Sequence, residues 1–166
     1  MLGRSIRVAG DEMDEAIMHY FRLKYSLLLG QPTAESLKMS IGSAAPIKEK
    51  FAVVRGRDLE TGLPKSKKLS SDEVREALSP VIQEIVTNIK DTLEEAPPEL
   101  VSDIMQHGIV MAGGGSMIEG IDKVISDATK TKVLIADDPL TCVVRGCGRL
   151  LDDQSLLKKI RVTSGF

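Results

Sequence analysis

A short apolar run followed at once by three glycines limits the possible folds of this chain more than any other feature. In the stretch HGIVMAGGGSMIEGID, the run IVMA is typical of a buried strand, and Gly113 to Gly115 end it. Ser116 and Glu119 have the spacing of a capping box, and apolar residues at helical spacing follow them. The sequence therefore predicts a strand, a glycine turn and a helix that starts directly after the turn.

The glycine turn has two possible roles. Its bare backbone and the following helix start suit a nucleotide, but three glycines alone also fit a plain tight turn. A Walker A loop is excluded because no lysine and hydroxyl pair follows in register. The dinucleotide fingerprint Gly-x-Gly-x-x-Gly fits Gly113 and Gly115 and meets Ile118 at its third glycine, although Asp137 lies about 20 residues on, as a ribose-binding acid would. A small dinucleotide-binding oxidoreductase domain is therefore the alternative interpretation.

The sequence pattern of the first part of the chain predicts a strand, two helices and a hairpin. Residues Ser5 to Ala9 alternate as in a strand, and Gly10 precedes a helix with an acidic first turn. A short helix starts near Pro32 and ends near Gly42. Two strands flank a Thr-Gly-Leu-Pro turn in KFAVVRGRDLETGLPKSKKLS, whose lysines are typical of a solvated edge.

The sequence pattern of the second part of the chain predicts further helices and two further strands. Ser70 and Glu73 form a capping box that opens a helix to about Leu93, which Pro80 should kink or restart. The other expected elements are a helix over residues 99–106, strands over 108–112 and 132–136, and a helix with Asp138 as N-cap and Pro139 at its first position. Two glycines inside this last helix, Gly146 and Gly148, indicate that backbone or ligand packs close to it.

The alternation of strands and helices predicts an α/β fold with a small inserted unit. We expect a core of residues 1–45 and 81–151, an inserted α+β unit of residues 46–80, and a carboxy-terminal tail of residues 152–166 without a sustained pattern.

The amino-acid composition limits the classes of partner, metal site and compartment that we expect for this chain. The net charge of −2 and the few aromatic residues give nucleic acid neither a basic surface nor stacking platforms, so we expect no nucleic-acid partner. Cys142 and Cys147 lack the spacing of a redox or zinc motif and are expected to be structural thiols, and His19 and His107 lack neighbours of metal-ligand spacing. Without a membrane-spanning run or a signal-peptide pattern, the cytoplasm is the expected compartment.

Five segments, taken in order, resemble the MreB family of bacterial actin-like cytoskeletal proteins. They are RVAGDEMDEAI, TAESLKMSIGSA, VRGRDLETGLP, APPELVSDIMQHGIVMAGGGSMIEGIDKVI and ADDPLTCVVRGCGRLL, and the resemblance covers about residues 3–151. It implies a partial actin-like ATPase domain of the ribonuclease H-like class that binds ATP, with Mg²⁺ in the complete protein. It also implies filaments formed by self-association, a cell-elongation machinery at the membrane as partner, a role in cell shape, and a place in the cytoplasm at the inner face of the membrane.

The resemblance also assigns nucleotide contacts. The adenosine end of ATP falls on Gly113, Gly114, Gly115 and Ser116, and the phosphates fall near Gly10. The short helix that borders the same nucleotide contributes Glu35, Ser36, Leu37 and Lys38. We expect Glu35 near the ribose hydroxyls and Lys38 near the purine, because a carboxylate accepts from hydroxyls and a lysine stem can cover a base edge. Without the resemblance, Glu35 and Lys38 would indicate only a solvated ion pair.

Members of the family are about twice as long as this chain. Their first half carries the phosphate loop, the acid that orients the attacking water and the membrane-inserting segment, so this chain should supply one wall of an ATP site and make no membrane contact of its own. The family's ATPase is slow and serves polymerisation, and these residues alone are not expected to be catalytic. In the family's strand order 3-2-1-4-5, the strand over residues 5–9 would lack its neighbour and be unpaired or displaced. A free-standing interaction module that reuses half of the actin fold also stays open.

Overall fold

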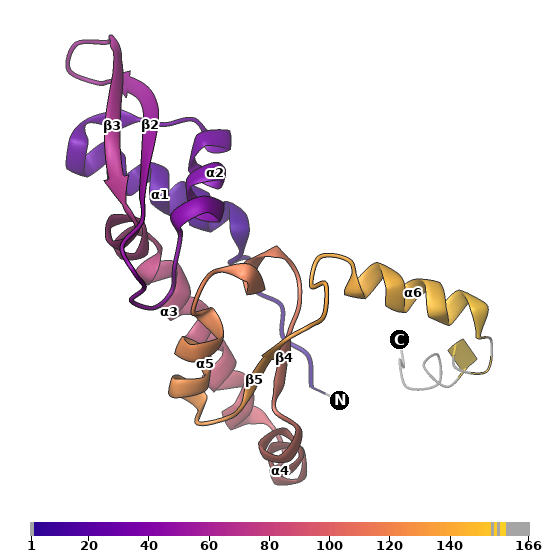
Figure 1. The fold of residues 1–166 in the computed structure, drawn as a ribbon. Coiled ribbons are helices and arrows are strands. Elements are labelled where there is room, and N and C mark those ends of the chain that lie inside the picture. The colour runs from indigo at the N-terminus through magenta and orange to yellow at the C-terminus, as the bar shows by residue number, and fades with distance from the viewer. Residues whose placement is uncertain (1, 154, 156, 159–166) are drawn as a thin grey trace.

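The computed structural model describes residues 2–153, 155, 157 and 158, and it shows an elongated molecule (Figure 1). A β-hairpin lies at one end and a short helix at the other, with the longest helix running between them. The helices are α1 (Gly10–Tyr25), α2 (Gln31–Ile41), α3 (Ser71–Glu95), α4 (Pro98–His107), α5 (Ile121–Thr129) and α6 (Cys142–Asp152), with a 3₁₀ helix η1 (Gly114–Met117). The strands are β1 (Leu27–Leu28), β2 (Phe51–Asp58), β3 (Pro64–Ser70), β4 (Ile109–Met111) and β5 (Val133–Ile135). The molecule mixes helices and strands, as the resemblance implied.

The hairpin predicted around the Thr-Gly-Leu-Pro turn is confirmed. β2 and β3 pair antiparallel from Phe51 opposite Ser70 to Arg57 opposite Pro64, and β1 adds two residues to the other edge of β2. Val54 and Leu69 are buried because they point inward from the hairpin, whereas Val53 on the outward face is exposed.

The core lies where α1, α2 and α3 meet the inward face of the hairpin, and α5 extends it along α3. Apolar residues at helical spacing supply it, as the sequence pattern predicts. The most buried members, each at most 2% exposed, are Met13, Ile17, Phe21, Leu27, Ala34, Leu37, Leu69, Val74, Leu78, Ile121 and Ile125.

α3 is a single helix of 25 residues that begins at the predicted capping box. The Glu73 N–H donates to Ser70 Oγ at 3.3 Å, and the Ser70 N–H donates to Glu73 Oε2 at 3.0 Å. The expected restart at Pro80 is wrong, because the helix continues through it to Glu95. Buried residues on both sides of the exposed proline, among them Leu78 and Ile82, hold the helix in place despite the missing N–H donor.

The two strands predicted around the glycine turn and near residue 134 are confirmed as a parallel pair. Ile109 faces Val133, and Met111 faces Ile135. In contrast, Ser5 to Ala9 form no strand, because no strand of the described residues pairs with them. A strand needs a hydrogen-bonded neighbour, and the resemblance implied that this segment would be unpaired or displaced.

The start of α6 differs from its prediction. Asp138 has a left-handed φ of 48°, and its carboxylate accepts from the Thr141 hydroxyl, so Asp138 and Pro139 form a turn and Thr141 is the N-cap. Both cysteines lie on this helix as free thiols. No backbone of the described chain packs close to Gly146 and Gly148, since an added Cβ would meet no atom within 4 Å at either position, and the ligand alternative stays a prediction. Figure 1 shows why: α6 projects away from the body.

The division into a core and an inserted unit stays a prediction, and most of the expected tail lies outside the described residues. Within the described part of the chain, no helix combines the length and the apolar character that a membrane crossing requires.

Candidate functional site

The glycine turn after β4 is anchored on one side and open on the other. The Gly113 N–H donates to the Pro139 carbonyl at 2.8 Å, which ties the turn to the loop after β5. Gly113 has a φ of 84°, a backbone conformation that favours glycine. A Cβ added at Gly113 or Gly115 would meet nothing within 4 Å, and one at Gly114 would only touch Leu140 at 3.6 Å. The turn therefore presents bare backbone at the carboxyl end of a parallel strand pair, where α/β sheets bind ligands.

The helix predicted directly after the glycines starts later than expected, and the Ser116 and Glu119 capping box is wrong. The Ser116 hydroxyl donates back to the Gly113 carbonyl at 2.7 Å, which closes η1, and Ser116 is buried. The Glu119 carboxylate instead accepts from Lys50 Nζ at 2.6 Å. Gly120 then takes a left-handed conformation, and α5 begins only at Ile121. The Ser116 hydroxyl thus takes a local partner and the Glu119 carboxylate a distant one, and the spacing of a capping box indicates neither.

The end of α2 is joined to the segment that follows η1. Ser43 and Glu119 form a parallel β-bridge, and the Ala44 N–H donates to the Glu119 carbonyl at 2.8 Å. A Cβ added at Gly120 would lie 2.7 Å from Ala45 Cβ, so the two backbones approach closely here. This joint brings α2 and the glycine turn, two of the three predicted contact regions, into one structural unit.

The third predicted region, Gly10, is joined to α2 by Lys38. The Lys38 Nζ donates to the Gly10 carbonyl at 2.9 Å and lies 2.8 Å from Asp14 Oδ1. Gly10 and Lys38 are therefore brought together. Of the other predicted α2 residues, Glu35 and Ser36 are exposed, whereas the Leu37 side chain lies in the core and is not available to a ligand in this structure.

Sequence reasoning missed Asp14, which is 2% exposed on α1. Asp14 is four residues after Gly10, so its carboxylate lies on the helix face next to the glycine. That spacing was readable, but only the fold shows that Lys38 reaches it.

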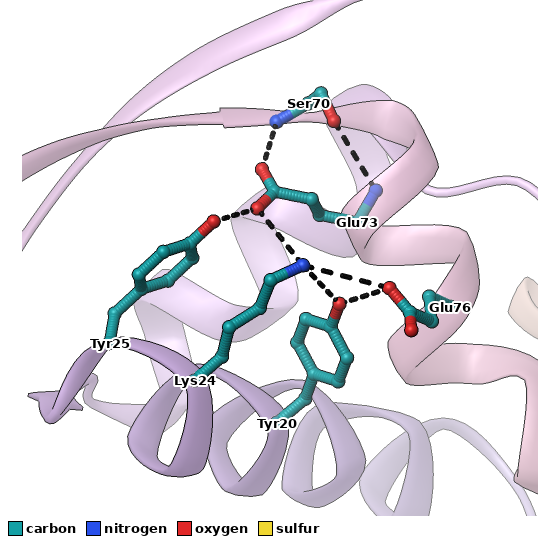
Figure 2. Close-up of polar contacts among 6 residues, drawn as sticks. All are labelled: Tyr20, Lys24, Tyr25, Ser70, Glu73 and Glu76. Atoms are coloured by element: carbon teal, nitrogen blue, oxygen red, sulfur yellow. Dashed lines mark hydrogen bonds and ion pairs between the residues drawn. The ribbon is translucent and has the colours of Figure 1, made fainter.

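A second polar cluster lies at the opposite end of α1 and was also missed (Figure 2). Lys24 Nζ donates to the Tyr20 hydroxyl at 2.6 Å and lies 3.4 Å from Glu73 Oε1 and 3.7 Å from Glu76 Oε2. The Tyr20 hydroxyl also bonds Glu76, and the Tyr25 hydroxyl bonds Glu73. We call these five residues the α1–α3 clamp, because they fix the end of α1 to the start of α3.

The clamp shifts the ionisation of its members. The Tyr20 hydroxyl is the main cause that raises the pKa of Lys24. Burial alone would raise the pKa of Glu73, but hydrogen bonds from the Tyr25 hydroxyl and the Ser70 N–H, together with Lys24, outweigh it and leave the pKa below its ordinary value. Both shifts favour the charged forms, so the clamp is an ion-pair network at neutral pH.

A metal ion finds no ready ligand set in the described part of the chain, where no three His, Cys, Asp or Glu side chains gather. We therefore assign no chemical step to Mg²⁺, and its binding in the complete protein stays a prediction.

Comparison with known protein families gives one assignment over nearly the whole chain. A family model described as MreB/Mbl protein matches residues 1–159. The chain is 44% identical to the cell shape-determining protein MreB of Escherichia coli strain K12 over 149 residues, and this aligned region covers 89% of this chain and 43% of that protein. Over 160 residues it is 38% identical to the cell shape-determining protein Mbl of Bacillus subtilis strain 168, at 96% and 48% coverage. The chain thus spans about half the length of these relatives.

Solved structures agree with this assignment. The crystal structure of MreB5 of Spiroplasma citri bound to ADP superposes with a TM-score of 0.88 at 40% identity, over 95% of this chain and 48% of that one. The same protein bound to AMPPNP gives the same TM-score at 39% identity, over 97% and 48%. The MamK double helical filament, at 23% identity, a TM-score of 0.75 and coverage of 89% and 46%, shares the fold.

Proposed function

This chain belongs to the MreB/Mbl family of actin-like cell shape-determining proteins, and we propose that it forms one wall of the ATP site of a filament-forming protein. The observation that carries the proposal is the open glycine turn at the carboxyl end of β4, joined through Ser43 and Glu119 to the helix that contains Glu35 and Lys38. The two MreB5 structures with bound nucleotide support it, because they share this fold at about 40% identity.

Each residue has a role that its chemistry allows. Bare backbone at Gly113 to Ser116 lets the base and ribose approach closely. The exposed Glu35 carboxylate accepts hydrogen bonds from the ribose hydroxyls, and the Lys38 stem covers the base edge. Gly10 at the start of α1 lies on the phosphate side.

The wider activity follows the family and is proposed as such. In the complete protein, ATP binding with Mg²⁺ accompanies slow hydrolysis and self-association into filaments that organise cell shape. The filaments work with a cell-elongation machinery in the cytoplasm at the inner face of the membrane, which is contacted through the family's other half. The oxidoreductase alternative finds no support, because Ile118 occupies the third fingerprint position and the chain belongs to another family.

A titration followed by NMR tests the site even if half a site binds weakly. Adding ADP or AMPPNP to the ¹⁵N-labelled chain should shift the amides of Gly113 to Ser116 and of Glu35 to Lys38. A dinucleotide fingerprint would require NAD⁺ to bind more tightly than ADP, and we expect that it does not. Shifts confined to other elements would assign the nucleotide elsewhere and contradict the proposal.

A pair of matched variants isolates the turn. Gly115→Val fills open space without straining the backbone, because an added Cβ meets nothing within 4 Å and no positive φ is involved. Gly146→Val on α6 makes the same change at an equally open position outside the site. We expect ADP affinity to fall about tenfold or more, which is about 1.4 kcal/mol, in the first variant and to stay unchanged in the second. Equal affinities in both variants would remove the turn from the site.

A further inference from the structure

The buried carboxylate of Asp14 is the feature of the described chain that the proposed contacts leave unexplained. It is 2% exposed, and Asp14 is not among the residues that the resemblance assigns to the nucleotide. Placing a carboxylate in the interior is costly unless a cation and hydrogen bonds compensate it. A residue kept at that cost calls for a specific role.

Lys38 is the cation that compensates it. Its Nζ lies 2.8 Å from Asp14 Oδ1, and its side chain is 11% exposed against 3% for Asp14. An ammonium group has three N–H donors. One donor goes to the Gly10 carbonyl at 2.9 Å. The ammonium pairs with Asp14 by charge at 2.8 Å, without a hydrogen bond to the buried Oδ1, so a donor and the alkyl stem stay available to a ligand.

Gly10 fits the same arrangement. A Cβ added there would lie 3.4 Å from Lys38 Nζ, at the edge of ordinary contact. The lysine tip thus lies against the bare backbone of Gly10, and its two acceptors are one turn apart on α1. The lysine crosses from α2 to α1 and is held at its tip by two groups of the same helix.

We propose that Asp14 is a positioning residue of the nucleotide site: it draws the Lys38 ammonium onto α1, so that Lys38 presents its stem and one fixed donor to the base. This rests on the proposed nucleotide site and adds the residue that sets its selectivity for the base. Because the ammonium is neutralised by Asp14, Lys38 acts on the base edge rather than as a free charge for phosphate. A purine extends further than a pyrimidine, so a fixed stem and donor should favour ADP over CDP.

A purely structural ion pair would behave differently. Its loss would weaken folding and lower the affinity for ADP and CDP by the same factor. Loss of a positioning residue instead lowers the ratio of ADP affinity to CDP affinity, and the effect requires Lys38. A double-mutant cycle separates the two, because a residue that works through another has no further effect once that partner is gone.

The experiment compares Asp14→Asn, Lys38→Met, the double variant and a control, Asp72→Asn, which removes an exposed ion pair with Arg75 on α3. Affinities for ADP and CDP come from NMR titration, and urea unfolding follows stability. We expect each of the first two variants to lower ADP affinity about tenfold and CDP affinity less, by analogy with residues that orient a ligand-binding group. The double variant should match Lys38→Met, and Asp72→Asn should match the wild type.

The spectrum of lysine ammonium groups gives a reading without nucleotide. Lys38 should show a slowly exchanging NH₃⁺ resonance in the wild type that disappears in Asp14→Asn. If Asp14→Asn does not fold, Asp14→Glu replaces it. That variant keeps the charge and moves it by one methylene, and a lowered ADP to CDP ratio would support the proposal.

Two results would overturn the role of Asp14 alone: an unchanged ADP to CDP ratio in a folded variant that still binds ADP, or an Asp14 effect that persists in the Lys38→Met background. Wild-type chain that shows no nucleotide-induced shifts in either predicted region would overturn the nucleotide site and the Asp14 proposal together.

Discussion

Replacing Gly120 by alanine should break the joint between α2 and the glycine turn. Gly120 precedes α5 with a φ of 81° and a ψ of 7°, and a Cβ there would lie 2.7 Å from Ala45 Cβ and 3.3 Å from the Ala45 backbone nitrogen. The neighbouring Ala44 N–H bonds the Glu119 carbonyl, so the backbones cannot separate without losing that bond.

Two costs add in this variant. A left-handed conformation costs a residue with a Cβ roughly 1–2 kcal/mol relative to glycine. Overpacking of a tight contact costs about 1–3 kcal/mol more, because two methyl carbons normally sit near 3.5–4.0 Å and must move apart by about 1 Å. The free energy of unfolding should therefore fall by about 2–5 kcal/mol, a large share of the stability of a small domain.

Urea unfolding of the chain, followed by circular dichroism, measures the loss. Gly62→Ala is the matched control, because Gly62 has a φ of 73° with no atom within 4 Å of an added Cβ and pays only the conformational cost. The double variant Gly120→Ala with Ala45→Gly should recover the steric part. If Gly120→Ala and Gly62→Ala lower the stability equally, the close approach of Ala45 is not a constraint and the reasoning about the joint is refuted.

Three further predictions test other parts of the chain. The pKa of Glu73 is lowered from its ordinary value of 4.5, so the clamp should stabilise the fold fully above pH 4.5 and lose this contribution as the pH falls through the lower pKa of the folded state. Acid unfolding of Glu73→Gln should lack this part of the pH dependence. Identical acid unfolding profiles of the variant and the wild type would contradict the prediction. The purified chain should release no phosphate from ATP above a no-protein control, because the resemblance implies that the groups that position water and phosphate lie in the other half of the fold. Each such group is worth about a hundredfold in rate. The amides of Ile6 and Val8 should exchange hydrogen at nearly unprotected rates, since no strand of the described chain pairs with them, and protection equal to that of Phe21 would show that the segment has found a partner.

Local patterns predicted most of the elements correctly. The Ser70 and Glu73 box, the turn between β2 and β3, and the run that became β4 each depend on neighbours within a few residues, so the sequence specifies them locally. The helix α2 and its end before Gly42 belong to the same class.

Errors arose where side chains bond other partners than the caps that their spacing predicts. Ser116 and Glu119 have ideal spacing for a cap, but the Gly113 carbonyl and Lys50 take their side chains. Lys50 lies 69 residues away from Glu119, a distance that no local pattern reports. Asp138 does not cap α6, because it adopts a left-handed conformation and its carboxylate accepts from the nearby Thr141 hydroxyl.

The candidate site was predictable only in part. Resemblance supplied Gly10, Glu35, Lys38 and the glycine turn, and the fold shows that Gly10 and Lys38 meet. The role of Asp14 could not be predicted, because its burial and its ion pair with Lys38 depend on how α1 and α2 pack, which a single sequence does not state.

The unbroken helix α3 has a mechanical consequence. It spans 25 residues, about 37 Å, and runs from the hairpin end of the molecule to the end that carries α4 (Figure 1). A rotation of about 5° around its capped start would displace the far end by about 3 Å, because a stiff rod converts angle into travel in proportion to its length. The clamp contacts α3 at Glu73 and Glu76, close to this pivot. Contacts near a pivot move least when the helix rotates, so they must be strong to resist the rotation. A change of a few degrees at one end would thus reach the other as a shift longer than a hydrogen bond can stretch.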